Sequence, residues 1–181
     1  MPRPRPVTAR GGIRWHRWNG WRIWKLPVNT LMDPRYLTED FREFLKCLNV
    51  AGVEYLLIGG HAVAYHGYVR PTTDMDVWIA LDRANAEKAV KAVREFFGTE
   101  MKGLSPEWFL NPENVSRFGV RPFLIEILTQ VSGGDFKSAF ARHIEAEIDG
   151  VRTNVIALDD LKANKRASGR NKDLADLDNL P

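Results

Sequence analysis

The stretch IGGHAVAYHGYVRPTTDMDVWIA, residues 58–80, combines a glycine pair with two closely spaced acids. Gly59 and Gly60 follow the apolar run VEYLLI, and Asp74 and Asp76 enter the apolar run DVWIAL. Short apolar runs bounded by turn residues are typical of buried strands. Because side chains on a strand alternate between its faces, the two acids should point the same way. The stretch therefore predicts a strand, a glycine turn opening a short helix, and a second strand that carries paired carboxylates.

The composition indicates an ordinary globular protein. The chain has 181 residues, of which 44% are hydrophobic and 27% charged, and this length suits one domain with a substantial core. No apolar run approaches the ~20 residues that a membrane helix needs, and the N-terminal residues lack the continuous apolar segment of a signal peptide. The single Cys47 excludes an internal disulfide framework and a multi-cysteine zinc site. We expect a cytoplasmic protein without a membrane partner.

The first 31 residues differ from the rest in charge. They hold seven basic and no acidic residues, so the remaining 150 carry 19 basic against 23 acidic ones. Four tryptophans recur there at every third position: Trp15, Trp18, Trp21 and Trp24. The pattern suits an arm that stacks on single-stranded nucleic acid, or an upstream extension, disordered or foreign to the native protein. We expect the extension, residues 1–31, followed by one domain over residues 32–181 that begins at Met32.

Strand and helix patterns mix along the remainder of the chain. Strands are expected at 53–58, 76–81 and near 122–130. Helices are expected at about 38–51, 61–68, 84–97, from 134, and at about 159–168 and 172–180. Asp149-Gly150 between two alternating runs predicts a hairpin. The hairpin makes part of the sheet antiparallel, so we predict an α+β fold, a single domain with a mixed sheet flanked by helices.

The paired acids predict a cation site. Two carboxylates this close repel one another, and both cannot stay ionised cheaply without a cation. Oxygen ligands at a strand end suit magnesium, which is usually shared with substrate phosphates. Glycines at Gly59 and Gly60 would let the backbone approach a phosphate, which a helix N-terminus also favours. Together these features predict a two-metal site for phosphoryl chemistry.

A third acid, Glu126, lies within the apolar run FLIEIL. An unpaired buried carboxylate costs roughly several kcal/mol, so it needs a positive partner. A metal shared with Asp74 and Asp76 would provide one. The alternatives are an exposed position at a sheet edge, or an ion pair with an arginine such as Arg121.

These motifs resemble the nucleotidyltransferase superfamily, whose members have a glycine turn, a spacer of about this length, Asp-x-Asp or Asp-x-Glu, and a later third acid. More closely, GGHAVAYHG, RPTTDMDVWI and LKANKRASGRNKDLADL look like small bacterial nucleotidyltransferase-like proteins akin to the toxins of toxin–antitoxin and abortive-infection systems. The resemblance covers roughly residues 38–178. It implies a nucleotidyltransferase-like fold and transfer of NMP from an NTP to a hydroxyl. The implied acceptor is RNA such as a tRNA end, a protein side chain or a small molecule, and a cognate antitoxin protein is the implied partner.

The resemblance also implies a set of site residues. Asp74, Asp76 and Glu126 would be both the catalytic and the metal-binding residues, holding two Mg²⁺ ions with the NTP. Glu126 departs from the family, in which this acid is commonly Asp. The residues implied for nucleotide binding are Gly59, Gly60, His61, Arg70, Thr73 and Lys165.

Alternatives stay open at Gly60, at Lys165 and for the function as a whole. Many members have Ser where this chain has Gly60, so phosphate contact would fall to backbone N–H groups or to His61. Lys165 could meet a leaving pyrophosphate, or could belong to a solvated face paired with Asp173 and Asp176. The competing function is a non-catalytic binding or regulatory module on the same fold. The presence of all three acids argues against it.

Overall fold

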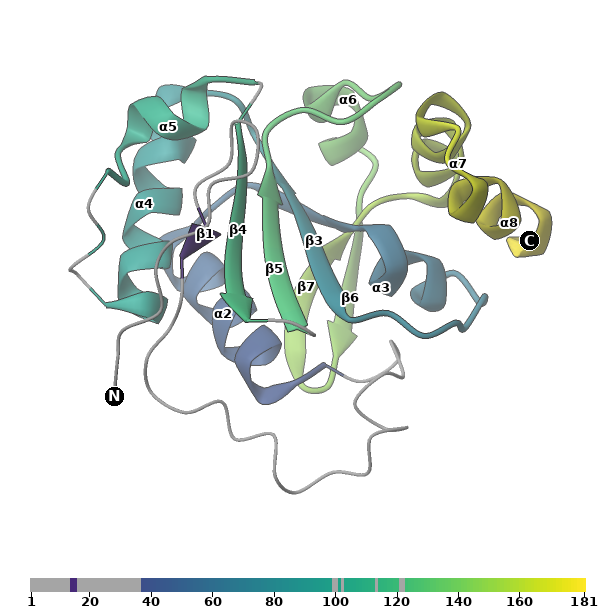
Figure 1. The fold of residues 1–181 in the computed structure, drawn as a ribbon, viewed down its shortest axis with the longest axis horizontal. Helices are drawn as coiled ribbons and strands as arrows, with labels where there is room; N and C mark the ends of the chain where they lie inside the picture. The colour runs from purple at the N-terminus through teal and green to yellow at the C-terminus, as the bar shows by residue number, and fades with distance from the viewer. Residues whose placement is uncertain (1–13, 16–36, 99–100, 102, 113, 121–122) are drawn as a thin grey trace.

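The computed structural model of the protein describes residues 14–15, 37–98, 101, 103–112, 114–120 and 123–181. They form a mixed seven-stranded sheet with the order β1-β4-β5-β3-β2-β7-β6, flanked by helices (Figure 1). The strands are β1 Arg14–Trp15, β2 Tyr55–Ile58, β3 Asp74–Ile79, β4 Val115–Val120, β5 Phe123–Leu128, β6 Ile144–Ile148 and β7 Val151–Val155. The helices are α2 Glu39–Ala51, α3 Gly59–Tyr65, α4 Arg83–Phe97, α5 Pro106–Leu110, α6 Phe136–Phe140, α7 Leu158–Ser168 and α8 Asn171–Asn179. The predicted α+β class is confirmed.

The sheet has two differently covered faces. Phe118 of β4 stacks on Phe97 of α4 with ring centroids 4.9 Å apart, so α4 covers that face, and α2 packs beside α4. Trp78 of β3 meets Phe136 of α6 edge-on at 5.2 Å on the opposite face. Asp74 and Asp76 lie four and two residues before Trp78 on β3. All three side chains therefore leave the same face of the sheet, which is the face that α6 covers.

Local signals in the sequence explain the helix boundaries near the core. Thr38 caps α2 by accepting a hydrogen bond from the Phe41 backbone N–H at 3.2 Å, and Gly52 ends the helix in the left-handed conformation. Asp82 caps α4 in the same way. The buried Asn85 amide then bonds to both backbone groups of Glu54, which joins the start of α4 to the entry of β2.

The hairpin is confirmed as β6 and β7, which pair antiparallel. Asp149 and Gly150 both have positive φ, 49° and 75°, as a two-residue turn of the primed type requires. The strand predicted near 122–130 is β5, and it has an antiparallel partner, β4, that the sequence did not predict.

Of the predicted leader, residues 1–31, only Arg14–Trp15 is described, as a short strand parallel to β4. The other residues of the leader, and Met32, lie outside the described residues, so the boundary at Met32 stays a prediction. Within the described part of the chain, no helix is both long and apolar enough to cross a membrane.

Candidate functional site

Strand register brings the three predicted acids together. β3 and β5 run parallel, and Asp76 is the register partner of Glu126. Neighbouring strands lie about 4.8 Å apart, so these two side chains leave the sheet next to one another. Asp74 follows on the same face two residues earlier, and all three acids are partly buried. The result is a patch of three carboxylates on the face of the sheet opposite α2 and α4.

This patch strongly perturbs Asp76. Burial raises the pKa of Asp76 to about 7, with the charges of Glu126 and Asp74 adding to the rise. The positive charges of Lys172 and Lys165 act in the opposite direction. Near neutral pH, Asp76 is therefore poised between its protonated and ionised forms, and a bound cation would favour the ionised form.

Glu126 has a positive partner on the next strand. Arg117 Nε donates to Glu126 Oε1 at 2.6 Å, and β4 pairs with β5 so that these two residues are in register. The sequence had suggested Arg121 as an alternative partner, and that residue lies outside the described residues. Sequence reasoning missed Arg117 because it did not predict β4.

The donor chemistry of the patch fits a hard divalent cation in part. Asp74 and Asp76 present carboxylate oxygens on one face, which is the ligand type that magnesium prefers. In the part of the chain that the structure describes, however, no three His, Cys, Asp or Glu side chains are arranged to hold a metal ion. Asp74 and Asp76 are thus the two residues suited to bind such a cation, while the carboxylate of Glu126 is paired with Arg117.

The glycine pair is explained by the packing of side chains from the neighbouring strand and loop. Gly59 adopts φ +65°, and a Cβ there would overlap Oδ2 of Asp76. A Cβ on Gly60 would come within 2.5 Å of Thr72 Oγ1. The sequence had suggested close approach of a triphosphate as the reason for these glycines. The structure shows a second reason, because Asp76 and Thr72 occupy the space that a side chain would need.

Gly59→Ala is expected to lower the free energy of unfolding by about 2 kcal/mol or more, since alanine must adopt a left-handed conformation and displace the Asp76 carboxylate. Gly52→Ala is a matched control, because Gly52 has φ +68° with open space around its Cβ position. Urea denaturation gives the unfolding free energy of both variants, and the difference between their losses is the cost of the overlap with Asp76. The excess cost of Gly59→Ala should shrink in an Asp76→Ala background, and an undiminished excess would contradict this packing.

The other predicted nucleotide-binding residues in this region have structural contacts. His61 is 4% exposed within α3 and meets the ring of Phe41 edge-on at 5.6 Å. Thr73 donates its hydroxyl to Asp74 Oδ1 at 3.3 Å, beside the acidic patch. A role of either residue in nucleotide binding stays a prediction.

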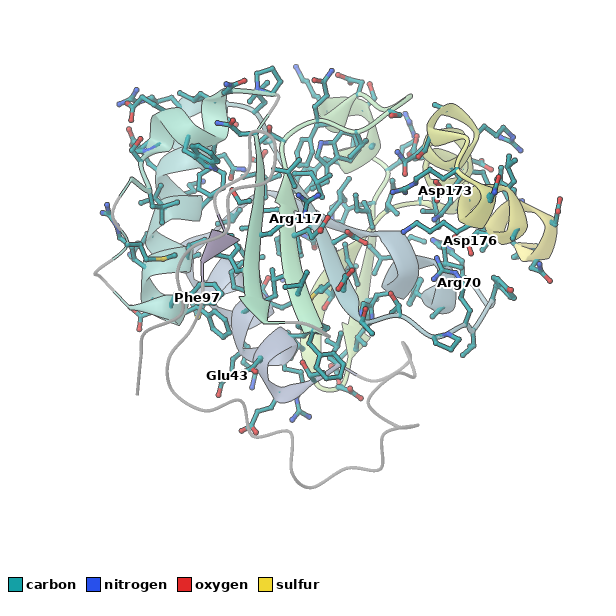
Figure 2. The ribbon with its side chains drawn as sticks, viewed as in Figure 1. Glu43, Arg70, Phe97, Arg117, Asp173 and Asp176 are labelled. Carbon is teal, nitrogen blue, oxygen red and sulfur yellow. The ribbon has the colours of Figure 1, made fainter. Side chains whose placement is uncertain are left out.

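Lys165 lies in a buried ion-pair cluster that joins α7, α8 and the segment before β3. Its ammonium group is 2.8 Å from Asp173 and 2.7 Å from Asp176. Arg70 forms two hydrogen bonds to Asp176, at 2.5 and 2.8 Å, and Arg170 bonds to Asp173 at 2.5 Å. Figure 2 shows Arg70, Asp173 and Asp176 close together beside α8. We call these five residues the C-terminal ionic cluster.

The cluster shows which residues pair with Lys165. Asp173 and Asp176 are its partners, as the second interpretation expected, yet Lys165 is 3% exposed and both aspartates are fully buried, so the face is not solvated. Burial would raise the pKa of each aspartate, but hydrogen bonds outweigh it and hold both pKa values below the ordinary range. The donors are Arg170, Lys165 and Ser168 for Asp173, and Arg70 and Lys165 for Asp176. Lys165 and Arg70 are thus already paired with carboxylates within the protein.

Comparison with known proteins adds a distant structural likeness. No family model matches the sequence, and no curated protein matches it. The chain is similar in structure to an antigenic nucleotidyltransferase-like protein from Paracoccidioides brasiliensis, with a TM-score of 0.42 and 18% identity over 75% of this chain and 73% of that one. A likeness at this level assigns no role to any residue of this chain.

Proposed function

We propose that the chain is a metal-dependent nucleotidyltransferase that moves NMP from an NTP to a hydroxyl group. The observation that carries the proposal is the register of Asp76 with Glu126, with Asp74 on the same face of the sheet. Acids crowded in this way without a cation are costly, as the raised pKa of Asp76 reflects. A magnesium ion would relieve that repulsion and would bring the phosphates of an NTP to the patch.

The residues of the patch would then have different roles in the reaction. Asp74 and Asp76 would hold the divalent cation, which when bound offsets the negative charge of the phosphates. The acceptor oxygen forms a bond to the α-phosphorus while the bond to pyrophosphate breaks. The hydroxyl proton passes to Asp76 or Glu126, the two acids that lie side by side. Lys172, exposed at the start of α8 and close enough for its charge to lower the pKa of Asp76, would meet the outgoing phosphates.

The first acceptor to test is RNA, such as a tRNA end, with a cognate antitoxin as the protein partner. This choice rests on the resemblance of residues 38–178 to toxin-type nucleotidyltransferase-like proteins. A protein side chain and a small-molecule hydroxyl are the other acceptor classes.

An NTP added together with Mg²⁺ is expected to raise the melting temperature by roughly 5–10 °C at a concentration about 100 times Kd, because a ligand that binds only the folded state stabilises it. Either component alone should give a much smaller shift, since Asp74 and Asp76 would hold the ion and the ion would offset the charge of the phosphates. Calorimetry and thermal melts with all four NTPs, with and without Mg²⁺, measure this. Asp74→Asn should abolish the shift, and Glu147→Gln, on the exposed side of β6, is the control. Absence of a shift at millimolar NTP would contradict the proposal.

A non-catalytic binding module is the second candidate, and two observations favour it. Glu126 is engaged by Arg117, and Gly60 stands where many members of the superfamily that the sequence resembles have Ser. Such a module would show the same thermal shift with NTP and Mg²⁺. It would release no pyrophosphate and transfer no labelled NMP to RNA, so an assay of those two products separates the candidates.

A further inference from the structure

The positively charged side chain of Arg117 lies in one row with two acids across three adjacent strands. Arg117 of β4 is in register with Glu126 of β5, and Glu126 is in register with Asp76 of β3. Phe118 faces α4, so its neighbour Arg117 points to the opposite face, which the acids share. Figure 2 shows Arg117 over the middle of the sheet, apart from the C-terminal ionic cluster. Arg117 therefore belongs to the acidic patch by position.

The contact between Arg117 and Glu126 is an ion pair with a short hydrogen bond. Its N–O distance is 2.6 Å, and the side chains are 36% and 18% exposed. A charge-assisted hydrogen bond of this length in a partly desolvated place gives Oε1 of Glu126 a positive partner without any metal ion. This agrees with the finding that, for the residues described, no group of three acids is arranged as a metal site.

We propose that Arg117 is a positioning residue that competes with a divalent cation for Glu126. The inference rests on the proposed metal site at Asp74 and Asp76. While Arg117 holds Glu126, the cation would have two acids available in place of three. The guanidinium would also repel a cation that approached Glu126, since the interaction between charges is strong at short range away from bulk water. Cation affinity would thus be held below what the three acids together can give.

The experiment is isothermal titration of the full chain with MnCl₂ and with MgCl₂, without nucleotide. Arg117→Gln is expected to bind the cation about tenfold more tightly than the unaltered protein, because Glu126 becomes available as a third ligand. Arg117→Lys keeps the charge and should stay within about twofold. Arg83→Gln is the matched control, since Arg83 pairs with Glu87 and Glu107 away from the patch and should change nothing.

A double-variant comparison distinguishes competition for Glu126 from a general effect of charge. If Arg117 acts through Glu126, the tenfold gain should disappear when Arg117→Gln is combined with Glu126→Gln. A tenfold gain that persists in full in that background would overturn the proposal, because removal of a positive charge near the patch would then explain it without Glu126. Melting curves of each variant establish that it is folded, and Arg117→Met, which also lacks the charge, tests the same competition if Arg117→Gln does not fold.

The outcomes also separate this inference from the proposed function. Cation binding by the unaltered protein without a gain in Arg117→Gln overturns the role of Arg117 alone. Failure of every variant to bind either cation overturns both the role of Arg117 and the metal site.

Discussion

Lys165→Met is expected to lower the free energy of unfolding by about 3–5 kcal/mol, a large part of the stability of a domain of this size. Lys165 lies between Asp173 and Asp176, and all three residues are almost completely buried. Removing the ammonium group leaves two buried carboxylates with fewer donors. Each carboxylate keeps its arginine, Arg70 for Asp176 and Arg170 for Asp173, but loses the one donor that is itself buried. The cost of these lost buried contacts exceeds the modest gain that methionine brings through its apolar side chain.

Urea denaturation followed by far-UV circular dichroism measures this loss. Lys88→Met, at an exposed position on α4, is the matched control and should change the free energy by less than about 0.5 kcal/mol. Adding Asp176→Asn to Lys165→Met should recover part of the loss, because the buried group that lost the Lys165 hydrogen bond is then neutral. A cost below about 1 kcal/mol for Lys165→Met would show that the C-terminal ionic cluster does not hold α7 and α8 in place.

The same variant bears on the interpretation of Lys165. If Lys165 binds phosphate, its removal would weaken nucleotide binding but leave the unfolding free energy nearly unchanged. As a member of the cluster, it would affect the site by positioning α7 and α8, whose Lys172 influences Asp76. Comparing unfolding of the nucleotide-free protein with nucleotide binding therefore distinguishes the two roles.

The features that the sequence predicted correctly are those that depend on local signals. The apolar spacing and the Thr38 and Gly52 caps predict α2. Asp149-Gly150 predicts the turn of the hairpin, because few other residue pairs accept positive φ at both positions. The alternation of β3 likewise predicts that Asp74 and Asp76 share a face.

The features that it missed depend on contacts between distant segments. β4 has no clean alternation, since Arg117 and Gly119 follow Val115 on the face of the acids, and its pairing with β5 creates the contact between Arg117 and Glu126. Likewise, helical spacing of the basic residues in α7 could not show that Lys165 points inward. That orientation follows from the packing of α8, which brings Asp173 and Asp176 to it.

Asp76→Asn is expected to stabilise the protein at pH 8 by about 2 kcal/mol while lowering the proposed transferase activity by about a hundredfold or more. In the folded protein, burial and the neighbouring acids raise the pKa of Asp76 to about 7, from an ordinary value of 3.8. Between pH 4 and pH 7 the unfolded chain has therefore lost the proton that the folded protein still holds. Asp76 lowers stability progressively as the pH rises through that window, and above pH 7 its effect is constant.

Thermal melts of the unaltered protein and of Asp76→Asn from pH 4 to pH 8 test this sign. The two should melt alike near pH 4, and the advantage of the variant should grow up to about pH 7. Asp178→Asn, an exposed carboxylate of α8, controls for the change in net charge. A difference that does not vary with pH would contradict the placement of Asp76 among buried acids.

The pH also separates the two ionic groups of this protein, because their pKa shifts have opposite signs. Asp173 and Asp176 have lowered pKa values, so they contribute stability above pH 4 that is lost as the pH falls further. Asp76 acts in the other direction and opposes folding above pH 4. Magnesium should reduce only the second effect, because a cation held by Asp74 and Asp76 favours the ionised form of Asp76. The advantage of Asp76→Asn at pH 8 should therefore shrink as magnesium is added, while the acid lability due to the C-terminal ionic cluster stays the same.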